Sequence, residues 1–228
     1  MRRLEFKRRA LRNPSGSCLV GFGLTQVLCS ATIEKGVPPF LRDTGQGWIT
    51  AEYSMLPGST PGGRKRREIG KRDGRSTEIQ RLIGRSLRAA VDMTRLGEVT
   101  ITIDCDVIEA DGGTRTASIS GGWVALYDAL TVLATEQGRP GPEHYLIGQV
   151  AAISVGIVDG KIACDLDYDH DSRADVDMNV VRRDGSLVEV QGTGENGSFT
   201  RAQLNELLDA ADAGIDEIMA AQRAVLQE

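Results

Sequence analysis

Apolar and polar residues alternate over Val99–Val107, and this period of two predicts a half-buried β-strand. Two glycines, Gly112-Gly113, follow within a few residues. Apolar side chains then recur at roughly helical spacing over Thr116–Leu133. The pattern therefore predicts a strand, a tight turn and a helix that opens on Thr114 and Arg115.

The N-terminal half shows further strand and helix patterns. Alternation predicts a strand pair over Ser17–Ile33 and a strand over Trp48–Met55. Over Ser76–Val91 apolar residues follow one helical face and arginines recur on the other, which predicts an amphipathic helix. Asp73-Gly74-Arg75 precedes this helix, so that Arg75 stands at a second helix entrance.

The C-terminal half is typical of hairpins closed by a long helix. Asp159-Gly160 and Asp184-Gly185 each separate two apolar alternations, which is a strong signal for a two-residue hairpin turn. Thr200 and Gln203 fit a capping box at the start of the last helix. Hairpins mixed with helices argue against a purely parallel doubly wound sheet. We expect a single α+β domain over residues 1–228, with helices packed on the sheets.

Acidic residues cluster in the same half. Asp165, Asp167, Asp169 and Asp171 occupy alternate positions, so an extended chain would project all four to one side. Asp177 opens the next strand six residues later. Such an oxygen-rich cluster suits Mg²⁺, which takes one or two carboxylates together with waters and substrate phosphates. The alternative is a solvated acidic edge strand that deters aggregation.

The charge is distributed unevenly along the chain. The net charge is −5, yet residues 1–88 hold 18 Lys and Arg against 7 Asp and Glu, whereas residues 89–228 hold 9 against 25. The densest basic run lies after a glycine- and proline-rich stretch and comprises Arg64, Lys65, Arg66 and Arg67. This asymmetry favours a polyanion-binding face on an acidic body, with the run as an RNA-binding loop. A solvated loop without a ligand is the alternative.

Gly112-Gly113 carries a candidate anion site. The first backbone N–H groups of a helix lack internal partners, and together with the helix dipole they favour negative charge. Arg115 in the first turn opposes that dipole, and a bound phosphate would remove the conflict. An ordinary glycine turn followed by a solvated arginine is the alternative.

Other chemistries have little material in this chain. The four cysteines are scattered without a CxxC pair, which argues against a disulfide framework or a zinc site and favours a reducing compartment. Two histidines offer little for a histidine-based triad. No uninterrupted apolar run approaches the length of a membrane span, and the N-terminus lacks the apolar block of a secretory signal. We expect a cytoplasmic protein that does not bind membranes.

Five segments spread along the chain resemble the RNase PH family of phosphorolytic 3′-to-5′ exoribonucleases. They are Gly45–Tyr53 (GQGWITAEY), Gly74–Ser86 (GRSTEIQRLIGRS), Ile103–Ser120 (IDCDVIEADGGTRTASIS), Asp175–Val181 (DVDMNVV) and Val188–Thr193 (VEVQGT). Because their spacing also resembles that of the family, the resemblance is more specific than any single motif.

The resemblance implies a site and an activity. The phosphate-binding residues would be Arg75, Gly113, Thr114 and Arg115, and Asp171 and Asp177 would bind a metal, expected to be Mg²⁺, and protonate the leaving group. The family's members use inorganic phosphate to trim the 3′ ends of tRNA precursors, release nucleoside diphosphates, run in reverse as nucleotidyltransferases and form ring-shaped hexamers. A homo-hexamer built as a trimer of dimers, and action on rRNA, are further expectations. A non-catalytic RNA-binding ring subunit and a metal-dependent hydrolytic nuclease remain open as alternatives.

Overall fold

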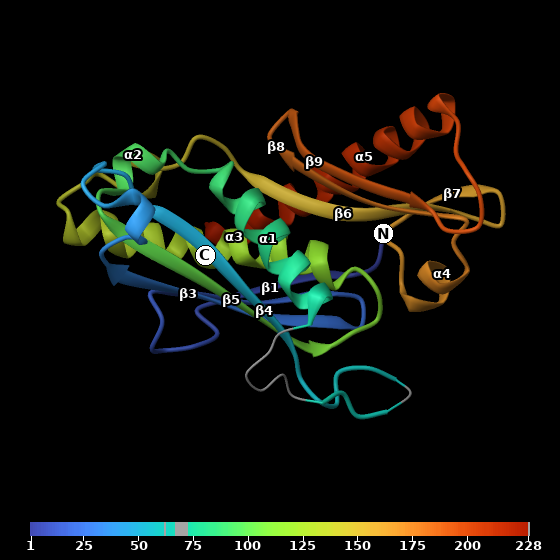
Figure 1. Ribbon diagram of the computed structural model, residues 1–228, viewed down its shortest axis with the longest axis horizontal. Helices are drawn as coiled ribbons and strands as arrows, with labels where there is room; N and C mark the ends of the chain where they lie inside the picture. Colours follow the sequence, from blue (N-terminus) through green and yellow to red (C-terminus); the bar gives the residue numbers. More distant parts are fainter. Residues whose placement is uncertain (62, 67–72, 228) are drawn as a thin grey trace.

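A computed structural model of the chain describes residues 1–61, 63–66 and 73–227. The described residues form a five-stranded and a four-stranded sheet with helices between and above them (Figure 1). The elements are β1 (Leu4–Arg8), β2 (Gly16–Phe22), β3 (Thr25–Lys35), β4 (Trp48–Met55), α1 (Gly74–Arg88), α2 (Met93–Leu96), β5 (Val99–Glu109), α3 (Thr114–Glu136), β6 (Val150–Val158), β7 (Lys161–Cys164), α4 (Tyr168–Arg173), β8 (Val176–Arg183), β9 (Ser186–Gly194) and α5 (Arg201–Leu226), with short 3₁₀ turns at Pro39–Leu41 and Pro142–His144.

The first sheet has the order β1-β2-β3-β5-β4 and contains one parallel pair, β4 with β5. The second sheet, β7-β6-β8-β9, is antiparallel throughout. Helices α1 and α3 lie between the two sheets, and α5 covers the other face of the second sheet (Figure 1). The expected α+β class and the hairpins are confirmed.

Helix α3 is the centre of the core because it packs on both sheets. Gly121 permits its close approach to β2, since a Cβ at this position would overlap the Val20 side chain. By length and composition α3 is apolar enough to cross a membrane, but 83% of its most apolar window is buried within the protein. Burial between two sheets accounts for this composition.

Strand patterns in the sequence predicted most elements closely. Trp48–Met55 is a strand with the expected ends, and the capping box at Thr200 and Gln203 is present at the start of α5. Strand β1 was not predicted, since its alternation runs through an arginine-rich terminus that reads as polar. It is held by a buried ion pair of Arg8 with Asp128 on α3.

The prediction of an extended chain that projects Asp165, Asp167, Asp169 and Asp171 to one side is wrong. Asp165 has a positive φ of 63° and ends the extended chain, and Asp167 then caps α4 by accepting a hydrogen bond from the His170 backbone N–H (2.9 Å). Asp165 is buried against Arg2 at 2.7 Å, and Asp169 pairs with Arg173 at 2.9 Å. Local capping and a long-range ion pair therefore replace the strand, and the four carboxylates do not share one side.

Candidate active site

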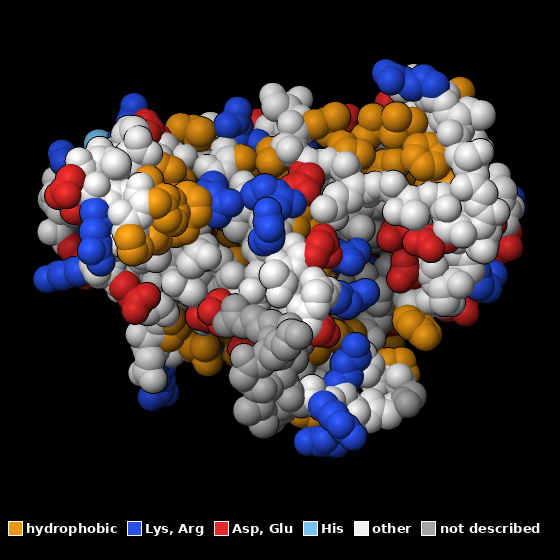
Figure 2. Space-filling view, viewed as in Figure 1, with side chains coloured by type: hydrophobic (Ala, Val, Ile, Leu, Met, Phe, Trp, Pro, Cys, Tyr) orange, Lys and Arg blue, Asp and Glu red, His pale blue; other side chains and the backbone are white. Residues whose placement is uncertain are grey.

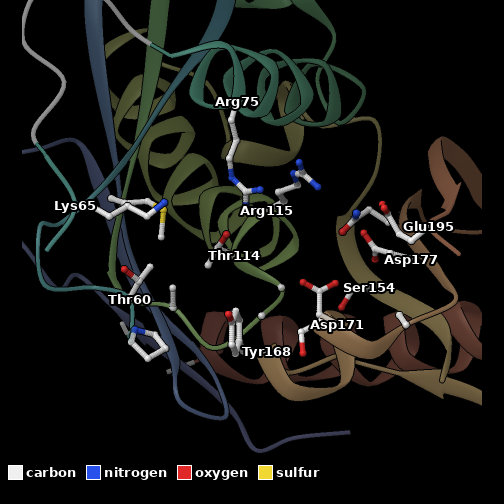
Figure 3. A pocket seen from close by; sticks show the side chains of 18 of the residues that line it. Thr60, Lys65, Arg75, Thr114, Arg115, Ser154, Tyr168, Asp171, Asp177 and Glu195 are labelled. Atoms are coloured by element: carbon white, nitrogen blue, oxygen red, sulfur yellow. The ribbon is translucent and has the colours of Figure 1, made fainter. Parts of the chain in front are cut away.

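A cavity of about 770 Å³ lies where the two halves of the chain meet. Figure 3 shows Arg75 from α1 and Arg115 and Thr114 from α3 on one side of it, with Asp171 from α4 and Asp177 from β8 on the other. Figure 2 shows basic side chains over α1 and the loop below it, and acidic side chains toward α4. The cavity thus joins a basic side to an acidic side.

The basic side is built on the Gly112-Gly113 turn. Both residues have positive φ, 74° and 66°, which glycine adopts without strain. A Cβ on Gly112 would also overlap the carbonyl oxygen of Leu166. The Thr25 hydroxyl fixes the turn by donating to the Gly112 carbonyl (2.6 Å) and accepting from the Asp111 N–H (2.8 Å).

Gly113 is the N-cap of α3 and offers no side chain to the first amides of the helix. These amides are therefore available to an anion in the cavity. Thr114 adds a hydroxyl beside them. Its Oγ1 lies 2.9 Å from the hydroxyl of the buried Tyr53, and burial raises the pKa of Tyr53, which keeps this phenol protonated at neutral pH.

Arg115 is anchored at one nitrogen and unsatisfied at another. Its Nη2 lies 3.2 Å from Oε2 of Glu78 on α1, whereas its Nε is buried and has no hydrogen-bond partner among the described residues. The guanidinium group nevertheless lines the cavity, where a bound anion would compensate its charge.

Arg75 reaches the cavity from the start of α1. Asp73 caps this helix, since its side chain accepts from the Ser76 N–H (2.6 Å). No hydrogen bond or ion pair holds the Arg75 side chain within the described part of the chain. Two guanidinium groups from separate helix starts therefore share one cavity (Figure 3).

The acidic side holds carboxylates with altered ionisation. Desolvation raises the pKa of Asp177 to about 6; Asp171 and Glu195 add to the rise and Arg115 opposes it. Desolvation also raises the pKa of Asp171, against the lowering effect of Arg115 and Arg75. Carboxylates that repel one another in a partly desolvated site favour a bound proton or cation.

The residues of the basic loop differ in whether they line the cavity. Lys65 lines the cavity, with its backbone N–H bonded to the Pro57 carbonyl (2.8 Å). Arg64 and Arg66 are exposed and do not line it. Arg67 lies outside the described residues.

Several cavity residues were not singled out in the sequence. Glu195 lies in the glycine-rich connection after β9. Ser154 and Asn179 face each other across β6 and β8 and are nearly buried, yet both line the cavity. A polar residue at an inward strand position was the available signal for the last two.

Two family models match this chain. The model of the 3′ exoribonuclease family, domain 1, matches residues 1–131, and that of domain 2 matches residues 148–214. The ribonuclease PH of Corynebacterium glutamicum (strain R) is 58% identical over 99% of this chain and 92% of its own length. The ribonuclease PH of Synechococcus sp. (strain JA-2-3B'a(2-13)) is 55% identical over 99% and 93%.

Solved structures share the fold at low sequence identity. Rice (Oryza sativa) Rrp46 has a TM-score of 0.80 at 17% identity, covering 100% of this chain and 96% of its own. An Archaeoglobus fulgidus exosome with RNA bound to the active site has a TM-score of 0.79 at 23% identity, covering 96% and 87%. With two family models spanning most of its length and relatives above half identity, the chain belongs to the ribonuclease PH group of the 3′ exoribonuclease family.

Proposed function

We propose that the cavity is the site at which this chain cleaves RNA with phosphate. As a member of its family, the chain is a phosphate-dependent 3′-to-5′ exoribonuclease and nucleotidyltransferase that processes tRNA. The observation that carries the assignment is the meeting of Arg75 and Arg115, from two helix starts, with Asp171 and Asp177 in one cavity.

Inorganic phosphate would bind at the basic side. Two guanidinium forks suit its oxygens. The Thr114 hydroxyl and the first amides of α3 would complete the shell. Because inorganic phosphate is already an anion near neutral pH, it needs no general base, and the chemistry is mainly charge neutralisation and positioning.

The RNA 3′ end would bind between the two sides. A phosphate oxygen attacks the terminal phosphorus, the bond from phosphorus to the 3′ oxygen of the preceding nucleotide breaks, and that oxygen takes a proton. Asp177 suits the proton transfer because its pKa of about 6 in the metal-free site leaves part of it protonated near neutral pH when no cation is bound to it. The products are a nucleoside diphosphate and RNA shortened by one nucleotide.

Asp171 and Asp177 are also the residues that would hold Mg²⁺. Two carboxylates fit the donor set of this ion, which takes its remaining ligands from water and substrate phosphates. Within the described residues no group of three His, Cys, Asp or Glu side chains forms a cation cage of its own. Bound there, Mg²⁺ would neutralise charge on the scissile phosphate. Loss of activity in a chelator, restored by Mg²⁺, tests this.

The test of the reaction is to supply a radiolabelled RNA with and without inorganic phosphate and identify the released nucleotide. Phosphorolysis requires phosphate and yields nucleoside diphosphates. A hydrolytic nuclease releases monophosphates without phosphate, and a non-catalytic ring subunit releases nothing. Either of these results contradicts the proposed reaction.

The loop would guide the body of the RNA. Lys65 lines the cavity, and Arg64, Arg66 and Arg67 are its neighbours in the sequence, a basic run that suits phosphate contacts carrying no sequence information. Replacing all four by Ser is expected to weaken tRNA-precursor binding and reduce its dependence on salt, measured by fluorescence anisotropy. An unchanged salt dependence contradicts this assignment.

We infer that the chain assembles as a homo-hexamer, a trimer of dimers. Two similar folds come from structures described as an archaeal exosome core and an exosome with bound RNA. Edge strand β9 exposes Leu187 and Val190, which are 52% and 40% accessible, and such apolar edges favour association. A mass of six chains by light scattering is expected, and a monomer contradicts it.

We infer that residues 1–228 form one folding unit that works in the cytoplasm. One hydrophobic cluster joins strands of both sheets, including Ile103 and Ile153, which supports a single cooperative unfolding transition. The four cysteines are free thiols, in keeping with a reducing compartment. Two separate calorimetric transitions would contradict the single unit, and cell fractionation tests the location.

A further inference from the structure

Tyr168 presents an exposed aromatic ring to the cavity. Its side chain is 57% exposed, and among the described residues it is the aromatic that lines the cavity. The ring has no aromatic partner, and its hydroxyl makes no hydrogen bond within the described part of the chain. Figure 3 shows it rising from α4 opposite Arg75.

The fold holds this ring in a fixed relation to the phosphate turn. The Tyr168 backbone N–H donates to Oδ1 of Asp111 at 3.3 Å, and Asp111 immediately precedes Gly112-Gly113. The residue before it, Asp167, caps α4, and the backbone there packs against Gly112 so closely that a Cβ on that glycine would overlap it. The ring is therefore attached to the turn that we assign to phosphate.

The same helix sets the spacing between the ring and the acidic side. Tyr168 and Asp171 are three residues apart in α4, which places them about 5–6 Å apart on one helical face. Asp171 also lines the cavity. A part of the RNA that contacts the Tyr168 ring therefore lies about one helical turn from Asp171, the carboxylate that we place beside the scissile phosphate.

We infer that Tyr168 stacks on a nucleobase next to the scissile linkage of the RNA 3′ end. An exposed aromatic beside a charged cavity is the usual platform for unpaired bases, and every base offers a π-face to it. Such a contact tolerates any sequence, as an enzyme that removes successive nucleotides requires. The inference rests on the proposed assignment of the cavity as the site of phosphorolysis.

The decisive experiment removes the Tyr168 ring and a single RNA base, separately and together, and compares the resulting losses of affinity. Binding of RNA carrying either an intact 3′ end or a single abasic ribose at the terminal or the penultimate position is measured for the full chain and for Tyr168→Ala. The full chain is expected to lose about 5- to 100-fold in affinity at one abasic position. Tyr168→Ala is expected to bind the intact RNA that much more weakly and to lose nothing further at that position.

The abasic position that couples identifies which base stacks, and coupling at either one supports the inference. Tyr168→Phe retains the ring and is expected to bind RNA as the unmodified chain does. Phe40→Ala is the matched control, since it removes a 66% exposed aromatic that does not line the cavity. Thermal melts and light scattering confirm that each variant is folded and assembled.

Three results overturn the inference. Tyr168→Ala could distinguish abasic from intact RNA as strongly as the unmodified chain does, or Tyr168→Phe could bind RNA as weakly as Tyr168→Ala does. The third such result is that the weaker binding of Tyr168→Ala follows from loss of assembly. Failure of the cavity assignment itself looks different. In that case Arg75→Ala and Arg115→Ala retain the normal phosphate KM, whereas failure of the stacking contact alone leaves both arginine variants impaired.

Discussion

The basic and acidic sides of the cavity are built in different ways. Arg75 and Arg115 each stand in the first turn of a helix, and local features, the Asp73 cap and the Gly112-Gly113 turn, set their positions. The carboxylates come from three separate segments, α4, β8 and the connection after β9. Local capping and turn residues therefore place each arginine at its helix start, whereas only the tertiary fold brings the carboxylates together.

The difference has an energetic consequence. A helix start carries partial positive charge that a bound anion satisfies, so the basic side awaits its ligand. Desolvation raises the pKa values of Asp171 and Asp177, and repulsion adds to the rise, from Glu195 on Asp171 and from Asp171 and Glu195 on Asp177. The acidic side therefore costs stability when no cation or proton is bound.

Asp177→Asn is expected to have the largest effect on the reaction. Removing this acid should lower kcat for phosphorolysis about 10²- to 10⁴-fold, the usual range for a lost proton donor. Asp175→Asn is the matched control, because it removes an exposed carboxylate two residues earlier that does not line the cavity. Equal activity of the two variants would contradict the role given to Asp177.

The same substitution is expected to stabilise the fold in the presence of a chelator. The pKa of Asp177 is raised to about 6 in the folded state from an ordinary 3.8, so the folded protein binds this proton more tightly than the unfolded chain. Ionised Asp177 therefore destabilises the fold above pH 6, by about 1–3 kcal/mol after allowance for its partial exposure. The Tm gain of Asp177→Asn should be largest above pH 7 and disappear toward pH 4; a gain independent of pH would contradict the cause.

Arg115→Ala is expected to have the next largest effect, and on phosphate specifically. Loss of a bidentate charge-assisted contact of about 1.5–3 kcal/mol raises the phosphate KM about 10- to 100-fold. RNA affinity should change little. Arg81→Ala removes an exposed arginine of α1 outside the cavity and serves as the control. If Arg115→Ala trims RNA normally at low phosphate, the basic side is not the phosphate site.

Tyr53→Phe is expected to have the smallest effect. The Tyr53 hydroxyl lies 2.9 Å from Thr114 Oγ1, so the two hydroxyls orient each other beside the cavity. Loss of this orientation, worth about 1 kcal/mol, should raise the phosphate KM about 5-fold with little change in kcat. Tyr145→Phe is the matched control. It removes the hydroxyl of another buried tyrosine, which donates to Gln137 at 3.0 Å and does not line the cavity, and it should leave the phosphate KM unchanged.

The strands and long helices could be read from the sequence because burial is periodic in them. Val99–Glu109 forms the expected strand, and the helix after Gly113 begins where the glycine pair predicts. The α4 segment could not be read in this way. Its alternating aspartates fit a strand, but capping by Asp167 and the pairing of Asp165 with Arg2, 163 residues away, favour a helix.

The sequence by itself determined the helix starts, the glycine turn and the arginines that follow them, because capping and backbone conformation are properties of neighbouring residues. It also determined the family, through motifs distributed along the chain. Only the tertiary structure decided that Asp171 faces this cavity while Asp165, Asp167 and Asp169 do not, and that Glu195 and Tyr168 join it. These placements depend on packing between segments far apart in the chain, and no periodicity within one segment encodes them.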